Sequence, residues 1–134
     1  MKETTKKYLI LGALVIAVCG VMIAKNLRTY QQAAGLADDS VIGKGKPVLL
    51  ELGSHSCVPC KEMMPILDEL SNEQTAFVVS FVDVWADEEK SNQYEVELIP
   101  TQIFFDRDGV ELFRHVGFYP KEDILAKWKE FKIQ

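Results

Sequence analysis

The chain begins with a long apolar run that carries no charge. Tyr8–Ala24 contains 17 residues without a single charged side chain. As a helix it would be roughly 25 Å long, slightly short of a bilayer core of about 30 Å, and snorkelling side chains and slight bilayer thinning close that gap. Lys7 precedes the run and Lys25 follows it. The pattern predicts one transmembrane helix over residues 8–24, within a basic anchor segment, residues 1–28.

Two other interpretations of this apolar run compete with a membrane anchor. A cleaved signal peptide would place its apolar region at Leu9–Ala17, but the run is long for that role and no clean small-x-small cleavage site follows it. A buried helix of a water-soluble core would show a polar stripe with a period of 3.6 residues, which the run lacks. The uncleaved anchor is therefore preferred, and secretion after signal cleavage is the alternative.

The pattern changes twice after the anchor. Residues 29–46 are polar and include the breakers Asp38-Asp39-Ser40 and Gly43-Lys44-Gly45, which is typical of a tether. Residues 47–134 alternate strand-like apolar runs with amphipathic helical segments. Strands are predicted at 48–52, 76–84, 101–105 and 110–115, and helices at 58–72, 87–96 and 120–131. This order, β-α-β-α-β-β-α, predicts an α/β domain with a mixed central sheet flanked by helices.

Charge is distributed unevenly along the chain, whose formal net charge is −5. Residues 1–28 hold five basic and one acidic side chain, whereas residues 29–134 hold ten basic and nineteen acidic side chains. The basic end favours an N-terminus inside the cell. The domain is then expected on the extracytoplasmic, periplasmic side of a bacterial inner membrane, where disulfides form. The acidic body repels phosphate groups, so nucleic acid is not an expected partner.

The candidate chemistry is concentrated in one motif, Cys57-Val58-Pro59-Cys60. It lies where a predicted strand ends and a helix begins. At a helix N-terminus the dipole and the free N–H groups stabilise a thiolate on the first cysteine, and Lys61 adds positive charge. The two-residue spacer brings both sulfur atoms within disulfide reach. The motif therefore predicts a redox-active dithiol.

A zinc half-site and a purely structural disulfide are the alternatives for this motif. Zinc needs four ligands, but Cys19 lies in the predicted membrane segment, and His55 and His115 could join a site only by coincidence of folding. Structural disulfides rarely close so small a loop. We therefore expect no metal and no cofactor other than the Cys57–Cys60 pair itself.

From Pro47 to Phe131 the sequence resembles the thioredoxin family. Three stretches carry the resemblance: VLLELGSHSCVPCKEMMPILDEL, then FVDV, then IPTQIFFDRDGVELFRHVG. The C-x-x-C motif and the following Lys61 match the family's active site, and Pro65 matches the proline of its active-site helix. Ile99-Pro100-Thr101 is similar to the family's cis-proline loop, and Gly109 and Gly117 match its turn and late-strand glycines.

The resemblance implies a role for each site residue. Cys57 is the exposed nucleophile, and Cys60 is the buried thiol that resolves the mixed disulfide. Pro100 is in the cis form beside the cysteine pair, and the backbone of Ile99 pairs with an extended substrate segment. The implied substrate-binding residues are Ile99, Val58 and Pro59.

Glu51 interrupts an apolar strand six residues before Cys57. The family carries its buried acid at this position, as a proton acceptor for the resolving cysteine. Burial should raise the pKa of Glu51, which suits a base that works near neutral pH. The alternative is an edge-strand carboxylate that points to solvent.

The sequence departs from the family at several positions close to the motif. The aromatic residues that the family carries near the first cysteine are Gly53 and Ser56 here, and the lysine that pairs with its buried acid is Val79. Trp85 either belongs to the core or flanks the active site. The partner surface and the reduction potential are therefore expected to differ from those of the cytosolic protein.

The resemblance implies a thiol-disulfide oxidoreductase that acts on protein disulfides. Reduction is the expected direction, because a Val-Pro spacer resembles reducing members of the family. The implied electron donor is a membrane conduit of the type that feeds cytochrome c maturation or a similar electron relay. A disulfide-forming oxidant or isomerase, and a non-catalytic thioredoxin-like adaptor, are the alternatives.

Overall fold

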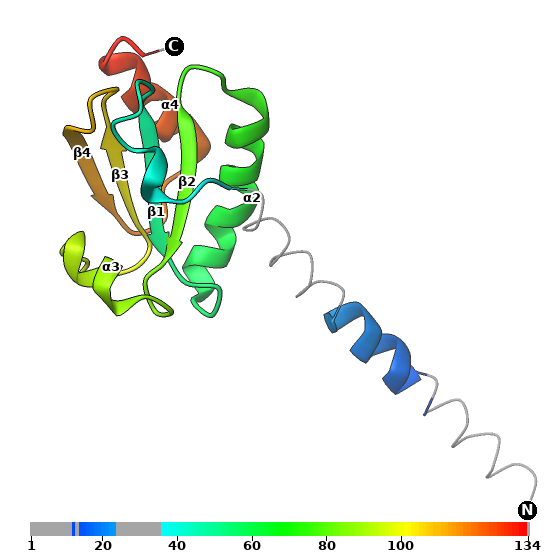
Figure 1. The fold of residues 1–134 in the computed structure, drawn as a ribbon. Helices are drawn as coiled ribbons and strands as arrows, with labels where there is room; N and C mark the ends of the chain where they lie inside the picture. The colour runs from blue at the N-terminus through cyan, green and yellow to red at the C-terminus, as the bar shows by residue number, and fades with distance from the viewer. Residues whose placement is uncertain (1–11, 13, 24–35, 134) are drawn as a thin grey trace, which may run out of the picture.

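The computed structural model describes residues 12, 14–23 and 36–133 (Figure 1). Its elements are η1 (Asp39–Val41), β1 (Val48–Gly53), α2 (Val58–Glu73), β2 (Val78–Asp83), α3 (Glu88–Gln93), β3 (Thr101–Phe105), β4 (Glu111–Val116) and α4 (Lys121–Glu130). From β1 to α4 this is the predicted β-α-β-α-β-β-α order, so the α/β prediction is confirmed.

The strands form one mixed sheet in the order β2-β1-β3-β4. Strand β1 runs parallel to β2 and antiparallel to β3, and β3 runs antiparallel to β4. All six residues of β1 are buried, because the strand lies inside the sheet and both of its faces are covered. Successive side chains alternate between the faces, so Glu51 shares one face with Leu49 and Gly53, whereas Leu50 lies on the other.

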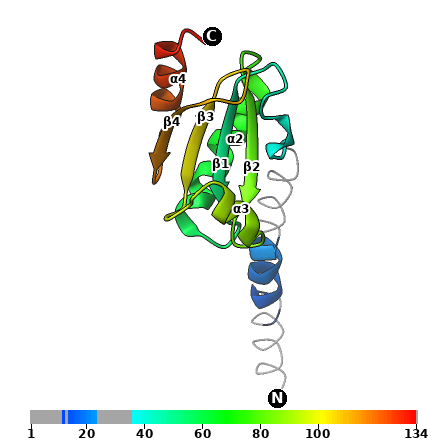
Figure 2. The ribbon, with the colours of Figure 1, turned by 60° about the vertical axis from the view of Figure 1, so that its left-hand side comes forward.

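Other elements cover both faces of the sheet (Figures 1 and 2), and each face carries its own apolar cluster. Helices α2 and α4 cover one face, where Leu49 of β1 and Phe104 of β3 belong to one cluster with the helix residues Met63, Leu67, Ile124 and Trp128. On the other face, Val48, Leu50, Leu52, Ile103 and Phe105 pack with Val41, Ile42, Tyr94 and Val96 from the segments around η1 and α3. The face under α2 is the one that carries Glu51.

Helix α2 places the C-x-x-C motif at its beginning. Pro59 lies in the first turn, where the missing N–H leaves no intrahelical bond unmade, and the helix continues past Pro65 to Glu73. Its buried side consists of Cys60, Met63, Met64, Leu67 and Leu70. The second cysteine of the motif therefore belongs to the core-facing side of the helix.

The helix predicted at residues 87–96 is shorter in the structure, and this prediction was wrong in its end point. Helix α3 ends at Gln93. Glu95 adopts φ 51, and the Val96 N–H donates to the carbonyl of Ser91 at 2.9 Å. This is a Schellman-type ending, in which Glu95 occupies the left-handed position that glycine usually takes. Because no glycine stands at this position, no local pattern marks the end of the helix.

The segment before β1 packs on the sheet. Ala37 forms a parallel bridge with Ser80, and its carbonyl accepts a 3.0 Å hydrogen bond from the Phe81 N–H. Val41 and Ile42 pack against the apolar cluster that contains Leu50, on the sheet face opposite α2 and α4. Residues 37–42 therefore belong to the folded domain, although they lie within the stretch 29–46 that the sequence pattern assigns to a tether.

Residues 14–23 are helical and expose large apolar side chains, among them Ile16 and Met22. Within the part of the chain that the structure describes, no helix is both long and apolar enough to cross a bilayer. The span predicted over residues 8–24 includes positions 8–11, 13 and 24, which lie outside the described residues.

Candidate active site

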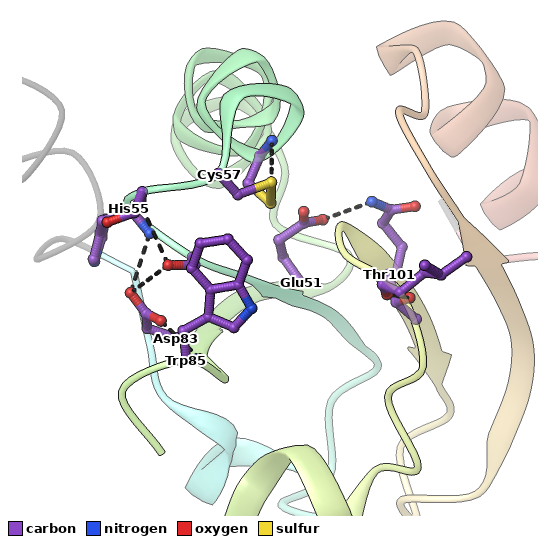
Figure 3. Close-up of a disulfide and its surroundings, with 11 residues drawn as sticks. Glu51, His55, Cys57, Asp83, Trp85 and Thr101 are labelled. Atoms are coloured by element: carbon purple, nitrogen blue, oxygen red, sulfur yellow. Dashed lines mark hydrogen bonds between the residues drawn. A yellow bond between two sulfur atoms is a disulfide. The ribbon is translucent and has the colours of Figure 1, made fainter. Parts of the chain in front are cut away.

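Cys57 and Cys60 form a disulfide at the start of α2, with their Cα atoms 5.3 Å apart (Figure 3). Cys57 is the N-cap residue of the helix, and its sulfur accepts a hydrogen bond from the Cys60 N–H at 3.3 Å. Cys57 retains 7% of its surface exposed, whereas Cys60 has none. Cys57 is therefore the more accessible residue of the two, and its sulfur receives an N–H group of the helix end, which favours a thiolate.

The first turn of α2 supplies the exposed surface beside the disulfide. Val58 is 68% exposed, and Pro59 and Lys61 are exposed as well. The Lys61 N–H donates to the Cys57 carbonyl at 3.1 Å, which closes the first helical turn. An apolar Val58-Pro59 surface next to Cys57 can contact a protein that brings a disulfide to this end of the helix.

The Ile99–Pro100 peptide bond is cis, as the resemblance implies. Thr101 pairs with Leu52 across β1 and β3, so Pro100 lies at the same end of the sheet as the loop that leads to Cys57. The carbonyl of Pro100 accepts a 2.7 Å hydrogen bond from the Gly117 N–H, and the Thr101 hydroxyl donates to the Leu98 carbonyl at 2.6 Å. These bonds hold the loop from both sides.

Glu51 is completely buried on the α2 face of β1, so the solvent-facing alternative is wrong. Its Oε2 accepts a 3.0 Å hydrogen bond from Nε2 of Gln102, and its Oε1 is buried without a partner. Burial raises the pKa of Glu51 to about 8, and the hydrogen bond from Gln102 opposes that rise. A carboxyl group with such a pKa can exchange a proton near neutral pH.

Gly53 of β1 packs closely against the second cysteine. A Cβ atom at this position would lie 3.3 Å from both Cβ and Sγ of Cys60 and 3.4 Å from Cε2 of Phe81. A side chain here would press on the disulfide. The absence of the family's aromatic residue at Gly53 is therefore matched by tight packing of the strand against Cys60.

Asp83, the last residue of β2, joins the two loops beside the disulfide. Its Oδ2 accepts from the His55 N–H at 3.1 Å and from the Ser54 hydroxyl at 3.4 Å. Its Oδ1 accepts from the N–H groups of Trp85 at 3.0 Å and Ala86 at 3.2 Å. One carboxylate thus fixes the loop before Cys57 relative to the loop after β2 (Figure 3).

The family of thioredoxin-like domains matches residues 35–132 of this chain, nearly all of the described fold. The chain belongs to this family. It is 34% identical to a thioredoxin of Mycoplasmoides gallisepticum over 86 residues, which are 64% of this chain and 85% of the relative. It is 37% identical to a thioredoxin of Mycobacterium tuberculosis over 95 residues, which are 70% of this chain and 80% of the relative.

Solved structures of thioredoxins share the fold. A mutant thioredoxin of Halobacterium salinarum superposes with a TM-score of 0.62 at 27% identity, over 72% of this chain and 82% of its own. The exposed lipoprotein thioredoxin of Streptococcus pneumoniae superposes with a TM-score of 0.58 at 26% identity, over 66% of this chain and 87% of its own. With its C-x-x-C pair, this thioredoxin-like protein is a thiol-disulfide oxidoreductase.

Thioredoxin-like proteins act through their redox-active disulfide and use no cofactor. Among the residues described here, no group of three or more His, Cys, Asp or Glu side chains is placed to hold a metal ion. His55 instead lies against the ring of Phe81, and His115 stacks on Tyr119. The zinc alternative therefore finds no ligand set in this part of the chain.

The structure brings some of the residues singled out from the sequence together and places others elsewhere. Four of them, Cys57, Cys60, Glu51 and Pro100, meet at the end of the sheet where α2 begins. His115 lies on β4, and Cys19 is exposed on the helix at residues 14–23. Trp85 is 64% exposed beside the disulfide, so it flanks the site and is no part of the core (Figure 3).

Sequence reasoning missed Gln102 and Asp83. Gln102 is a fully buried amide directly before the apolar residues Ile103, Phe104 and Phe105, and its place in a strand was the one local signal. Asp83 stands at the end of a strongly apolar strand, where an acid is ordinary. Its position between two loops is visible only from the fold.

Proposed function

We propose that this thioredoxin-like protein is a membrane-anchored reductase of protein disulfides on the extracytoplasmic side of a bacterial inner membrane. The observation that carries the proposal is the unequal cysteine pair with a buried carboxyl group on the adjacent strand. Cys57 is partly accessible at a helix N-terminus, Cys60 is inaccessible, and Glu51 is buried on the face that packs against Cys60.

The reaction begins with the reduced dithiol. The Cys57 thiolate attacks one sulfur of a substrate disulfide, which forms a mixed disulfide and releases the first substrate thiolate. Cys60 then gives its proton to Glu51 and attacks the Cys57 sulfur, so the second substrate thiolate leaves. Two electrons pass to the substrate, and the protein ends in the disulfide form seen in the structure.

Substrate contacts come from the exposed surface around Cys57. Val58 and Pro59 offer apolar contact, and the Ile99 backbone beside the cis-proline offers pairing to an extended segment. A protein disulfide in an extended stretch of chain fits this arrangement.

Three features support membrane anchoring on the outer side. The run from Tyr8 to Ala24 is uncharged with basic flanks, and the helix at residues 14–23 exposes its apolar side chains. The similar thioredoxin of Streptococcus pneumoniae is described as an exposed lipoprotein. A reductase outside the cytoplasm needs electrons from the membrane, so we propose a membrane electron donor of the kind that serves cytochrome c maturation.

The reduction potential of the Cys57–Cys60 pair tests the direction of the reaction. A reductase is expected near the potential of thioredoxin, about −270 mV, whereas a value near about −120 mV would identify a disulfide-forming oxidant. Insulin reduction gives a second test, in which Cys57→Ser abolishes activity and Cys60→Ser traps substrates as mixed disulfides. Full function in Cys57→Ser would instead indicate a non-catalytic adaptor.

Membrane fractionation tests the location. The anchored chain is expected to stay with membranes after an alkaline wash, at its full mass, and to be digested by protease added to spheroplasts. A shortened protein in the soluble periplasmic fraction would indicate signal cleavage and would contradict the anchor.

A further inference from the structure

We propose that Gln102 is a positioning residue, which holds one oxygen of Glu51 so that the other faces Cys60 and receives its proton. The inference rests on the proposed role of Glu51 as proton acceptor. It adds to that role the residue that orients the carboxyl group and sets how readily the group accepts a proton.

The register of the sheet places the two side chains opposite each other. Glu51 on β1 and Gln102 on β3 are directly paired, and neither has any exposed surface. Nε2 of Gln102 donates to Oε2 of Glu51 at 3.0 Å. Directly opposite residues of an antiparallel pair keep their side chains within contact distance, so this bond is maintained by the backbone of the sheet itself.

The hydrogen bond occupies only one of the two carboxyl oxygens. Oε1 of Glu51 is buried without a partner. Glu51 and Gly53 lie on the same face of β1, and a Cβ at Gly53 would be 3.3 Å from the Cys60 sulfur, so this face packs against the second cysteine. Figure 3 shows the Glu51 side chain beside the disulfide, with its hydrogen bond directed away from the sulfur atoms.

Among the residues that the structure describes, no charged side chain adds to the effect of burial and of Gln102 on Glu51. Its partner on β2 is Phe81, and Val79 lies two residues earlier on the same strand. From α2 the titratable neighbour is Cys60, and on β4 the next titratable side chain in the row is His115, which pairs with Gln102. A neutral amide is thus the polar partner of this carboxyl group, and it stabilises the ionised form less than a cation does.

An amide suits a carboxyl group that must both accept a proton and release it again. Its N–H group stabilises the ionised carboxylate, which prepares Glu51 to take the Cys60 proton. After that transfer the proton sits on Oε1, and the bond from Gln102 to Oε2 remains. Gln102 therefore keeps the carboxyl group in one orientation before and after the step.

The test compares the full-length wild-type chain with Gln102→Met, which keeps an unbranched side chain of similar size and removes the donor. Carbon NMR of glutamate-labelled protein follows the Glu51 carboxyl titration, with the signal assigned by its loss in Glu51→Gln. Stopped-flow mixing with dithiobis(nitrobenzoate) separates two releases of coloured thiolate, the first from attack by Cys57 and the second from resolution by Cys60.

We expect Gln102→Met to move the Glu51 titration to higher pH and to slow the second release about 2- to 10-fold at neutral pH, with the first release unchanged. The pH profile of the second release should move by the same amount. In a Glu51→Gln background, Gln102→Met should change nothing further. Ser80→Ala is the matched control, because Ser80 is a buried polar residue of β2 opposite Leu50, on the other face of the sheet.

Several results would overturn the inference. One is a Gln102→Met protein that titrates and resolves like the wild type, and another is an equal loss in the Glu51→Gln background. If Glu51→Gln itself leaves the second release unchanged, the proton-acceptor role in the proposed function fails, and this inference fails with it. Gln102→Leu serves as a second donor-free variant, and urea unfolding verifies that each variant is folded.

Discussion

At the scale of single residues, Glu51 occupies a site that favours its protonated form. The side chain is completely buried, and burial raises its pKa to about 8 from an ordinary value of 4.5. Between these two values the unfolded chain has released the proton, whereas the folded chain still binds it. Folding is therefore linked to proton uptake, and the stability of the fold must fall as pH rises through this interval.

We predict that the free energy of unfolding of the oxidised protein falls between about pH 5 and 8 more steeply in the wild type than in Glu51→Gln. The difference should approach about 1.4 kcal/mol per pH unit, because one proton separates the two states. Urea unfolding at pH 5, 6, 7 and 8 measures the slope of the free energy of unfolding against pH for each protein. Subtracting the slope of the variant removes the contribution of the other titratable groups. Parallel slopes would show that Glu51 titrates normally in the fold.

The site residues that sequence could predict are those with a local signature. Cys57 and Cys60 are marked by their spacing, Pro100 by its place in the resemblance, and Glu51 by a charge inside an apolar strand. The contacts of Gln102 and Asp83 are distant in sequence. Gln102 bonds to Glu51 across a separation of 51 positions, and Asp83 bonds to His55 across a separation of 28 positions. Such contacts depend on strand register and on how loops meet, which local patterns do not encode.

At the scale of elements, Asp83 links the end of β2 to the start of α2. Its two oxygens accept bonds from the loop before Cys57 and from the turn that follows β2. The N–H groups of His55 and Trp85 lie outside the strands and helices, so for them the carboxylate takes the place of a ladder partner. The position of Cys57 relative to the sheet therefore depends on one side chain of the neighbouring strand.

We predict that Asp83→Asn destabilises the fold by about 1–3 kcal/mol, because the amide nitrogen of asparagine cannot accept and one pair of donors loses its partner. Amide hydrogen exchange should accelerate at His55 or at Trp85 and Ala86, ahead of the rest of the domain. Asp106→Asn is the matched control, since Asp106 accepts from Asp108 and Val110 in the β3–β4 turn. A local role for Asp83 would be contradicted if exchange at His55, Trp85 and Ala86 became faster in both variants or in neither.

The ends of the helices and strands also differ in how far local sequence determines them. The strands and helices agree with the sequence pattern within two residues except at α3. There the chain turns at Glu95 with a positive φ that no glycine announces. The end of α3 is thus set by this backbone turn, in which the Val96 N–H bonds to the Ser91 carbonyl.

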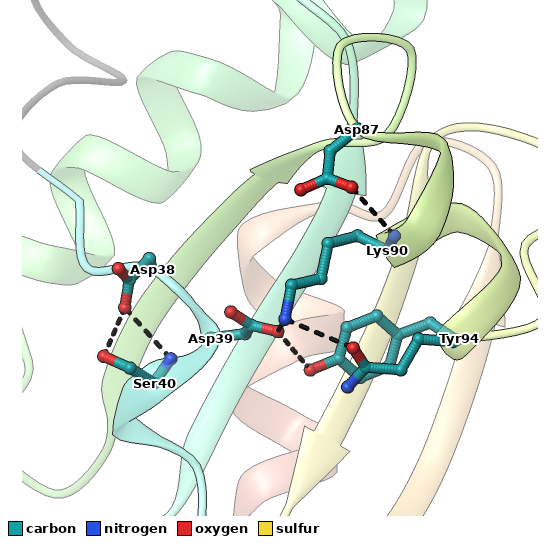
Figure 4. Close-up of polar contacts among 7 residues, drawn as sticks. Asp38, Asp39, Ser40, Asp87, Lys90 and Tyr94 are labelled. Atoms are coloured by element: carbon teal, nitrogen blue, oxygen red, sulfur yellow. Dashed lines mark hydrogen bonds and ion pairs between the residues drawn. The ribbon is translucent and has the colours of Figure 1, made fainter.

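At the scale of the whole molecule, the segment before β1 is fastened to α3 (Figure 4). The carboxylate of Asp39 accepts a hydrogen bond from the Tyr94 hydroxyl at 2.7 Å and pairs with the Lys90 ammonium group. Asp38 caps η1 by accepting from the Ser40 N–H at 3.0 Å. The sequence pattern predicted a tether here because its breakers are local, whereas the partners of Asp39 lie more than 50 residues further on.

This attachment fixes where the proposed anchor joins the catalytic domain. Ala37 pairs with Ser80 at the free edge of β2, so the contact also covers an edge strand that would otherwise present unpaired backbone groups. The proposed anchor precedes this segment in the sequence, so the attachment sets the point on the domain from which the chain would run to a membrane. Loss of the attachment should release residues 37–42 from the sheet and leave the redox chemistry intact.

We predict that Asp39→Ala accelerates amide exchange at Phe81, whose N–H bonds to the Ala37 carbonyl, and proteolysis within residues 36–46. Tyr94→Phe should have the same effect to a smaller degree, because it removes one of the two partners of Asp39. The release of thiolate from dithiobis(nitrobenzoate) should stay at the wild-type rate in both. Glu97→Ala, an exposed acidic residue in the loop after α3, controls for the lost charge. Exchange at Phe81 that is equal in Asp39→Ala and Glu97→Ala would mean that the β2 edge, and not the Asp39 contacts, holds the segment in place.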